Sequence, residues 1–430
     1  MPVKYPLPTG YTAPGFERVL RVYRDNFTKG IEKGSSFAAY YKGKLIVNIW
    51  GGLADQQVKR PWKDHTFGFF YSTTKFFAAV TIAHIVERGL LRYDEKIAKY
   101  WPDFAKNGKE EITLEMLLSH KAGLPALSNN FELSWMKDDP KKLYDALVDQ
   151  KPLWNPGDGH GYSPVVFGLY LNEIVKRVDK KGRTLSQYYW EEIGQPFGLD
   201  FHIGVPAHLQ YRAARLEPVV LTREDLAKMM EAFKLDPTIY ALAFSQPTDW
   251  NSSRKLNDPD FLQLPNSSSH GGGTAEAVAK LAGILANGGQ HDGKTLLSPD
   301  SIARLQEPLA DGVDRTTGSE NIHGRGTWLI PVVEGDQSWF MYGHAGYGDQ
   351  CCAADPRYKM GWAYTTNYLD PVINFNNKNK WRPLIKELFE CVHRLENVQV
   401  ERRILLSLTQ LEQEKSHASQ KSQVLQQSKL

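Results

Sequence analysis

The chain has 430 residues, of which 41% are hydrophobic and 23% charged, the proportions of an ordinary globular protein. The formal net charge is +3 and the basic residues are spread along the sequence, which argues against nucleic acid or an anionic membrane as a partner. The three cysteines are too few for a disulfide framework, and no segment approaches the roughly 20 apolar residues that span a bilayer.

The N-terminal part of the chain predicts a helix, a hairpin and a second helix. Apolar residues recur on one side of the segment from Phe16 to Lys33, as in an amphipathic helix. Strands are expected at Ser36–Tyr41 and Lys44–Trp50, joined by a tight lysine-glycine turn. The next helix is expected from Ser72 to about Arg88, and Gly89 ends it.

The middle of the chain, from about 92 to 221, predicts a mostly helical insertion into the sheet domain, because its helices and loops are rich in Trp, Pro and Lys. Further helices are predicted from Thr222 to about Lys234 and from Thr274 to Gly288. Four strands and a closing helix follow, at Gly326–Val333, Ser338–His344, Cys351–Asp355, Lys359–Thr366 and Trp381–Leu395.

The order of these elements predicts an α+β fold. Strands from both ends of the chain form an antiparallel sheet, which the N- and C-terminal helices flank. We expect one domain over residues 1–398, with the helical insertion at about 92–221. Residues 399–430 are rich in Gln, Ser, Lys and Glu and are expected to be a polar tail, helical or disordered.

Ser72-Thr-Thr-Lys75 places a hydroxyl and an amine three positions apart at the start of an apolar helix, where one turn brings them together. A serine hydroxyl becomes a useful nucleophile when another group takes its proton, and a partly desolvated lysine can do so. The same pattern also occurs by chance, and Ser72 on its own fits a helix cap beside a solvated Lys75.

Two later segments carry groups that could complete such a site. Tyr162 lies on a glycine-rich turn before an apolar helix, where a phenol, or a phenolate beside an ammonium, could relay a proton. The alternative is an ordinary half-buried tyrosine. Gly343-His344-Ala345-Gly346-Tyr347 ends a strand, and its backbone amides could stabilise an oxyanion. The alternative there is a hairpin turn with a solvated histidine.

These segments, in this order, resemble the serine β-lactamase and penicillin-binding-protein superfamily, most of all its class C branch, the related esterases and the eukaryotic β-lactamase-domain proteins. Ser72-x-x-Lys75 matches the first motif of the family. Tyr162-Ser163-Pro164 stands at its tyrosine-x-asparagine motif, and His344-Ala345-Gly346 at its lysine-threonine-glycine motif. Weaker similarity at Leu117–Leu124, Pro196–Leu199 and Gly271–Lys280 extends the resemblance from about Gly34 to about Tyr368.

The resemblance implies a β-lactamase/transpeptidase-like fold and a site of six residues: the catalytic Ser72, Lys75 and Tyr162, and the substrate-binding or oxyanion residues His344, Gly346 and Tyr347. Ser72 is the nucleophile that is acylated, and Lys75 and Tyr162 share the work of the general base. The amides of Ser72 and Tyr347 form the oxyanion hole. His344 takes the place of the basic residue that orients substrate and holds the tyrosine. No metal or cofactor is implied.

Two departures from the family motifs favour an ester or small amide over a β-lactam. Pro164 lacks the side chain of the asparagine that, in the family, bonds to the lysine and to the side-chain amide of a lactam. His344 is not permanently charged, so near neutral pH it holds a carboxylate less well than lysine does. The expected function is a serine hydrolase that acts through an acyl-enzyme on a small-molecule ester or amide.

Three alternatives stand beside this expectation. A catalytically silent scaffold or binding protein on the same fold is favoured by Pro164, since a fold does not guarantee its chemistry. His270-Gly-Gly-Gly273 resembles the oxyanion loop of α/β-hydrolases, but the chain has no glycine-x-serine-x-glycine elbow. A zinc hydrolase would need a His-Glu-x-x-His or a clustered Cys/His spacing, which is absent from the sequence.

The N-terminal segment and the cysteines bear on the cellular compartment of the protein. Met1–Pro8 has neither a signal-peptide nor a transit-peptide pattern, so we expect a cytoplasmic protein. The sequence leaves a homo-oligomer open. Cys351 and Cys352 are expected to pack on opposite faces of a strand, with a redox-sensitive pair as the alternative.

Overall fold

The computed structural model describes residues 5–217, 223, 227, 237–247, 255–369, 379–405 and 407–414. The strands of its main sheet are β1 (Thr9–Thr12), β2 (Gly34–Tyr41), β3 (Lys44–Asp55), β4 (Arg60–Pro61), β10 (Trp328–Glu334), β11 (Gln337–Gly346), β12 (Gln350–Asp355), β13 (Met360–Thr366) and β14 (Arg402–Ile404). They lie in the order β1-β3-β2-β13-β12-β11-β10-β14, with β4 beside β3, and each neighbouring pair is antiparallel.

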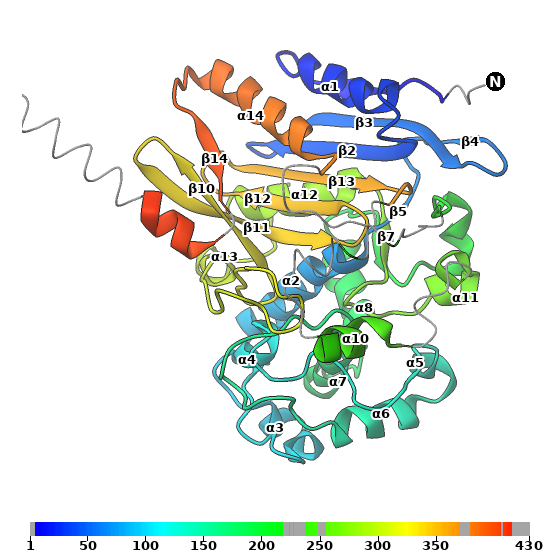
Figure 1. Cartoon of the computed structure of the whole chain (residues 1–430), viewed down its shortest axis with the longest axis vertical. Helices are drawn as coiled ribbons and strands as arrows, with labels where there is room; N and C mark the ends of the chain where they lie inside the picture. The colour runs from blue at the N-terminus through cyan, green and yellow to red at the C-terminus, as the bar shows by residue number, and fades with distance from the viewer. Residues whose placement is uncertain are drawn as a thin grey trace, which may run out of the picture.

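Helices cover both faces of this sheet (Figure 1). On one face lie α1 (Glu17–Thr28) and α14 (Arg382–Glu396), which come from opposite ends of the chain and contact each other. On the other face lie α2 (Thr74–Glu87) and α12 (Ala275–Ala286), whose residues are almost all buried. The sheet therefore separates two hydrophobic cores.

Side chains of the central strands alternate between these two cores, as the period of a strand requires. Phe37 packs in the core under α1 and α14, and the next residue, Ala38, packs in the core of α2 and α12. Cys351 and Cys352 also lie in different cores, which confirms that they pack on opposite faces.

The rest of the described chain is mostly helical and lies below the sheet in Figure 1. Its helices and helical turns are α3 (Ile97–Tyr100), η2 (Pro102–Ala105), α4 (Leu114–Leu118), α5 (Trp135–Asp138), α6 (Pro140–Asp149), α7 (Val166–Val178), α8 (Leu185–Tyr189), η3 (Trp190–Gly194), η4 (Ala207–Arg212), α10 (Pro237–Ser245), η5 (Lys255–Asn257), α11 (Pro259–Leu262) and α13 (Pro299–Leu305). Short strands form two further sheets: β5 (Gly68–Phe69) with β7 (Gly271–Gly273) and β6 (Phe201–Ile203), and β8 (Gln290–His291) with β9 (Lys294–Thr295).

This architecture confirms the predicted α+β fold with a mostly helical insertion, but several element bounds differ. Helix α1 ends at Thr28, before the predicted Lys33, because Gly30 has φ +70° and the Ile31 N–H turns back to the Asn26 carbonyl. The predicted helix from Thr222 to about Lys234 lies outside the described residues, apart from 223 and 227.

The C-terminal tail also differs from its prediction as helical or disordered. Strand β14 pairs with β10, with Ile404 opposite Val332 and Arg402 opposite Glu334. The Arg402 guanidinium fixes the strand, because it donates to Asp355 at 2.6 Å and lies 3.5 Å from the centre of the Phe389 ring. Residues 408–414 are helical, as expected, and 415–430 lie outside the described part.

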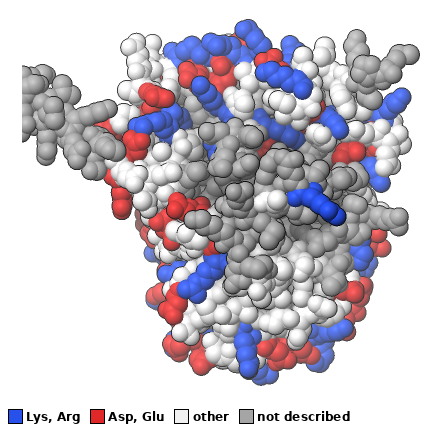
Figure 2. Space-filling model, in the orientation of Figure 1, with Lys and Arg blue, Asp and Glu red and all other residues white. Residues whose placement is uncertain are grey.

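The surface and the helix lengths bear on the predicted partners. On the face shown in Figure 2, basic and acidic side chains are interspersed, and neither sign forms a continuous patch on the part of the chain that is described. Among the described helices, none has both the length and the apolar character needed to cross a membrane.

Helix α12 packs so closely on β13 that one added methyl group at their contact should destabilise the fold. A Cβ at Gly361 would collide with the Gly283 amide, a backbone atom that cannot move aside as a side chain can. We expect Gly361→Ala to lower the free energy of unfolding by about 3 kcal/mol, the upper end of overpacking costs. The measurement is urea unfolding followed by circular dichroism.

Gly89→Ala is the matched control, because Gly89 has φ +72° and open space around it. There the added methyl group brings only the backbone strain of about 1–2 kcal/mol. A Gly361→Ala protein no less stable than Gly89→Ala would contradict the close packing of α12 on the sheet.

Candidate active site

Ser72 lies on a tight turn between β5 and α2. Residues Tyr71–Thr73 form a 3-10 turn (η1), so the α-helix begins two residues later than predicted. Tyr71 has φ +45°, a conformation that L residues rarely adopt. Its carbonyl accepts the Thr74 hydroxyl at 2.5 Å, and the Thr74 oxygen accepts the Gly271 N–H at 2.9 Å. These hydrogen bonds connect the turn to β7 and fix the position of Ser72 within the turn.

Lys75 lies beneath Ser72 and is completely buried. Its Nζ donates to the carbonyl oxygens of Pro164 at 2.8 Å and Ser268 at 3.0 Å, and lies 3.4 Å from Ser72 Oγ. Burial lowers the pKa of Lys75 well below its usual 10.5. A neutral amine that donates both of its N–H groups to carbonyls still has one lone pair. The Ser72 hydroxyl is the remaining neighbour that this lone pair can contact.

The Pro164 carbonyl bears on the most conspicuous departure from the family motif. The resemblance assigns a lysine contact to the asparagine side chain that Pro164 replaces. Here the backbone oxygen of Pro164 itself accepts from Lys75. The substitution therefore removes a side-chain donor while the lysine keeps a hydrogen-bond partner at this position.

Tyr162 lies beside this pair, with the centre of its ring 4.8 Å from Lys75 Nζ. Its backbone N–H donates to Asp314 at 2.8 Å, which fixes the turn. Burial raises the pKa of Tyr162 above its usual 10, although a hydrogen bond with Ser72 acts in the opposite direction. A phenol beside a neutral amine is therefore favoured over the phenolate beside an ammonium that the sequence suggests.

The end of β11 lies against the turn that carries Ser72. The Thr73 hydroxyl donates to the His344 carbonyl at 3.3 Å. A Cβ at position 346 would collide with the Phe70 carbonyl, so this approach requires Gly346. The next residue, Tyr347, packs its ring edge-on against Tyr71 at 5.5 Å. Glycine thus brings the two backbone segments predicted for the oxyanion hole next to each other.

His344 differs in character from the cation that it replaces. Its Nδ1 donates to the Ala345 carbonyl at 2.6 Å, which leaves the lone pair on Nε2. Nε2 is buried and has no hydrogen-bond partner among the described residues. Burial, with a smaller effect from Lys75, lowers the pKa of His344 to about 3. His344 is therefore a neutral hydrogen-bond acceptor, and its role in substrate binding stays a prediction.

Five of the six predicted site residues line one cavity of about 170 Å³, and Lys75 lies beneath its floor. Aromatic side chains of Tyr240, Phe244 and Trp328 form part of the wall. The remaining lining residues are Thr317, Ser319, Asn321, His323 and Ala345. Among the described residues that line the cavity, none has a Lys, Arg, Asp or Glu side chain.

Sequence reasoning missed two histidines that surround Tyr162. His120 accepts the Ser163 N–H at 3.3 Å, and its ring lies 5.0 Å from that of Tyr162. The ring of His323 lies parallel to Tyr162, 6.1 Å away. The segment around His120 served only as a marker of the resemblance. His323 follows a loop without periodicity, so no pattern in the sequence indicates its position.

Comparisons with known proteins identify the family of the chain. The Beta-lactamase family model matches residues 23–382. "Esterase/beta-lactamase LipL" of Mycobacterium tuberculosis is 25% identical over 377 residues, which cover 84% of this chain and 83% of that protein. The structure of a family VIII carboxylesterase has a TM-score of 0.79 at 30% identity, over 89% of this chain and 99% of the other.

A penicillin-binding protein homolog from Caulobacter crescentus has a TM-score of 0.78, also at 30% identity, over 89% of this chain and 99% of that one. The family match runs from within α1 to the first residue of α14 and includes every predicted site residue. The chain therefore belongs to the β-lactamase family, as the motifs of Ser72, Tyr162 and His344 predict.

Proposed function

We propose that this protein is a serine hydrolase that acts through an acyl-enzyme on an uncharged ester or small amide. The observation that carries the proposal is the buried Lys75 amine, which is held by two carbonyls and lies 3.4 Å from Ser72 Oγ. Two similar proteins, LipL and the family VIII carboxylesterase, are named as esterases, which supports the same reaction class.

The first half of the proposed reaction forms the acyl-enzyme. Ser72 Oγ attacks the carbonyl carbon of the substrate while Lys75 takes the hydroxyl proton. The amides of Ser72 and Tyr347 stabilise the oxyanion. The bond to the alcohol then breaks, the departing alkoxide takes a proton from the Tyr162 phenol, and the Lys75 ammonium reprotonates Tyr162.

The second half releases the acid. A water molecule gives a proton to Lys75 and attacks the ester carbonyl of acylated Ser72. The Ser72 oxygen leaves and recovers a proton through the same amine and phenol. Lys75 and Tyr162 begin and end the cycle neutral, in accord with the directions of their pKa shifts.

The charge of the cavity supports an uncharged substrate. Within the described part of the chain, the lining has no cationic side chain to pair with a carboxylate, and His344 is neutral above about pH 3. The aromatic wall of Tyr240, Phe244 and Trp328 instead offers an apolar surface to an acyl or alkyl group. A β-lactam, with its carboxylate, fits this lining less well.

A silent scaffold on the same fold remains the competing proposal. Its main support in the sequence was Pro164, and that support weakens because the Pro164 carbonyl accepts a hydrogen bond from Lys75. A scaffold also has no need of a buried amine without an acidic partner beside a hydroxyl, since burying an ionisable group is costly.

The nucleophile can be tested with an ester and a covalent probe. We expect the purified protein to hydrolyse p-nitrophenyl butyrate and to react with a fluorophosphonate. Ser72→Ala should abolish the labelling and lower kcat by about 10⁴-fold or more, because no other group accepts the acyl chain. Rates and intact-protein mass spectrometry are the measurements.

Ser186→Ala is the matched control, because the Ser186 hydroxyl donates to the Ile203 carbonyl and is not among the cavity residues. It should keep both the labelling and the rate. If folded wild-type protein is inert towards the probe, or if Ser72→Ala is labelled equally well, the proposed nucleophile is wrong and the scaffold is favoured.

The base can be tested through pH. Because burial lowers the pKa of Lys75, the neutral amine should already predominate well below pH 10.5. We expect kcat/KM for a neutral ester to rise with pH through one ionisation and to level off well below pH 10.5. In Lys75→Arg the cation cannot lose its proton, so hydrolysis should fall by several orders of magnitude. A rate that rises only around pH 10 or above would contradict a neutral lysine.

A neutral His344 predicts that the preference between uncharged and anionic substrates does not change with pH. We expect the ratio of kcat/KM for p-nitrophenyl butyrate to that for the anionic p-nitrophenyl hemisuccinate to stay constant from pH 5 to 9, since the pKa of His344 is about 3. His344→Lys should shift the ratio towards the anion by about tenfold or more, the worth of one hydrogen bond to a charged group. A wild-type preference for the anion that disappears near pH 6.5 would refute the neutral state.

A further inference from the structure

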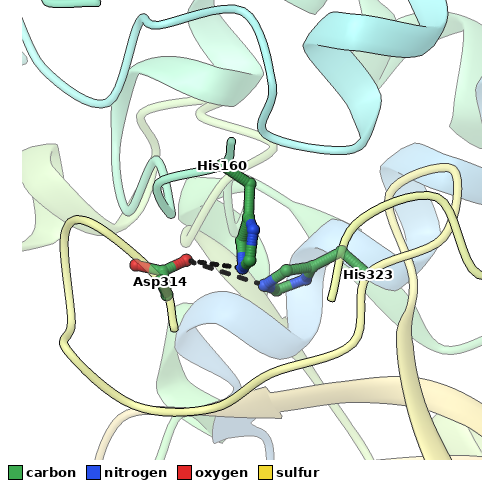
Figure 3. A group of neighbouring side chains, drawn as sticks. All are labelled: His160, Asp314 and His323. Atoms are coloured by element: carbon green, nitrogen blue, oxygen red, sulfur yellow. Dashed lines mark ion pairs between the residues drawn. The ribbon is translucent and has the colours of Figure 1, made fainter. Parts of the chain in front are cut away.

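Three buried side chains converge behind Tyr162, outside the pair of Ser72 and Lys75. His160 precedes Tyr162 by two residues, and Asp314 and His323 come from the loop between α13 and β10. Their exposed fractions are 3%, 0% and 4%. Figure 3 shows both imidazole rings pointing at one oxygen of the Asp314 carboxylate.

The separations in this cluster are too long for direct hydrogen bonds. His160 Nε2 lies 3.8 Å and His323 Nε2 3.9 Å from Asp314 Oδ2, beyond the usual limit of about 3.2 Å. Neither Nε2 atom has a hydrogen-bond partner among the described residues. Leaving a buried polar atom without a partner costs about 1–3 kcal/mol, so two of them facing one carboxylate indicate that something binds between the three.

We propose that His160, Asp314 and His323 bind a divalent transition-metal ion, and that this ion is zinc. Two imidazoles and a carboxylate are donors that zinc prefers, and the three donor atoms lie within 4.8 Å of one another. Donors bound at about 2.0–2.1 Å and arranged tetrahedrally are roughly 3.3 Å apart. The two separations from Asp314 need to close by about half an ångström, and the widest separation in the cluster, up to 4.8 Å, by up to about 1.5 Å. The family resemblance implies no metal, and the proposal departs from it here.

The protein already orients the donors as a metal site requires. Asp314 Oδ1 accepts the N–H groups of Thr316 at 2.9 Å and Thr317 at 2.8 Å, and Oδ2 accepts that of Tyr162 at 2.8 Å. Such bonds fix the direction of a ligating carboxylate. Burial also lowers the pKa values of both histidines, which keeps each Nε2 lone pair available, and a bound cation would keep the Asp314 carboxylate ionised.

The zinc ion would brace two loops of the cavity. One is the turn that carries Tyr162. The other includes Thr317, Ser319 and Asn321, which line the cavity wall. At present the backbone joins them through the Arg315 N–H, which donates to the His160 carbonyl at 3.0 Å. The ion would act as a positioning element for Tyr162. The site does not depend on Ser72, so it goes beyond the proposed hydrolase.

The test is zinc binding by the full chain. Protein stripped with a chelator is incubated with zinc, passed through a desalting column and analysed by mass spectrometry of the metal. We expect about one zinc per chain and a higher melting temperature than for the stripped protein. Asp314→Asn and His323→Gln should each weaken zinc binding at least about tenfold, since each removes or weakens a ligand.

His202→Gln is the matched control, because His202 Nε2 also lies 3.9 Å from a carboxylate, that of Asp200, and the residue is only 9% exposed. It should bind zinc as the wild type does. Ser72→Ala should also keep its zinc, so loss of the hydrolase hypothesis and loss of the metal hypothesis are separate results. Wild-type protein that retains no zinc and melts at an unchanged temperature would overturn the site, and so would equal retention by Asp314→Asn.

Cobalt substitution gives a second measurement that needs no variant to fold. The wild-type protein loaded with cobalt should show the visible bands of a nitrogen and oxygen site without a thiolate charge-transfer band. A thiolate band would assign the ion to a cysteine and overturn the proposal, as would the absence of any cobalt spectrum.

Discussion

The burial of one amine is the constraint on which the rest of the site depends. Lys75 reaches Pro164 and Ser268, which follow it by 89 and 193 residues, and the two carbonyls accept from it in a space closed to solvent. As an ammonium, Lys75 would need a third acceptor, and the nearest is the Ser72 hydroxyl, which loses its proton in the proposed reaction. Because burial disfavours the ammonium, the amine is neutral before the reaction and has a lone pair with which to accept a proton.

The site occupies the boundary between the sheet and the helical part of the molecule, and each side supplies different groups. The sheet supplies backbone at the end of β11, where Gly346 allows close approach to the turn of Ser72. The helical part supplies the Tyr162 turn and the carbonyl of Pro164. His344 sits between them without a charge. A neutral acceptor, in place of the cation that the family motif has, alters what the cavity can hold.

Much of the fold could be predicted because its signals are local. The turn residues between the strands identified β2, β3 and β10 to β13, and the spacing of Ser72 and Lys75 identified the pair that the structure brings together. Strand β14 was missed because it is a short, arginine-rich strand whose pairing partner lies about 70 residues earlier. The charge states of Lys75 and His344 depend on burial, and the meeting of His160 with Asp314 depends on loops about 150 residues apart. No pattern in the sequence indicates these charge states or this contact between loops.

The pairing of β14 with β10 has a consequence for where the folded unit ends. A chain stopped at residue 398, the predicted domain boundary, would lose the partner of Val332 and Glu334 and the arginine that lies over Phe389. The amide and carbonyl groups of β10 would then be open to solvent along an apolar strand. An uncovered border of this kind recruits strands from other molecules, so such a shortened protein would be prone to self-association.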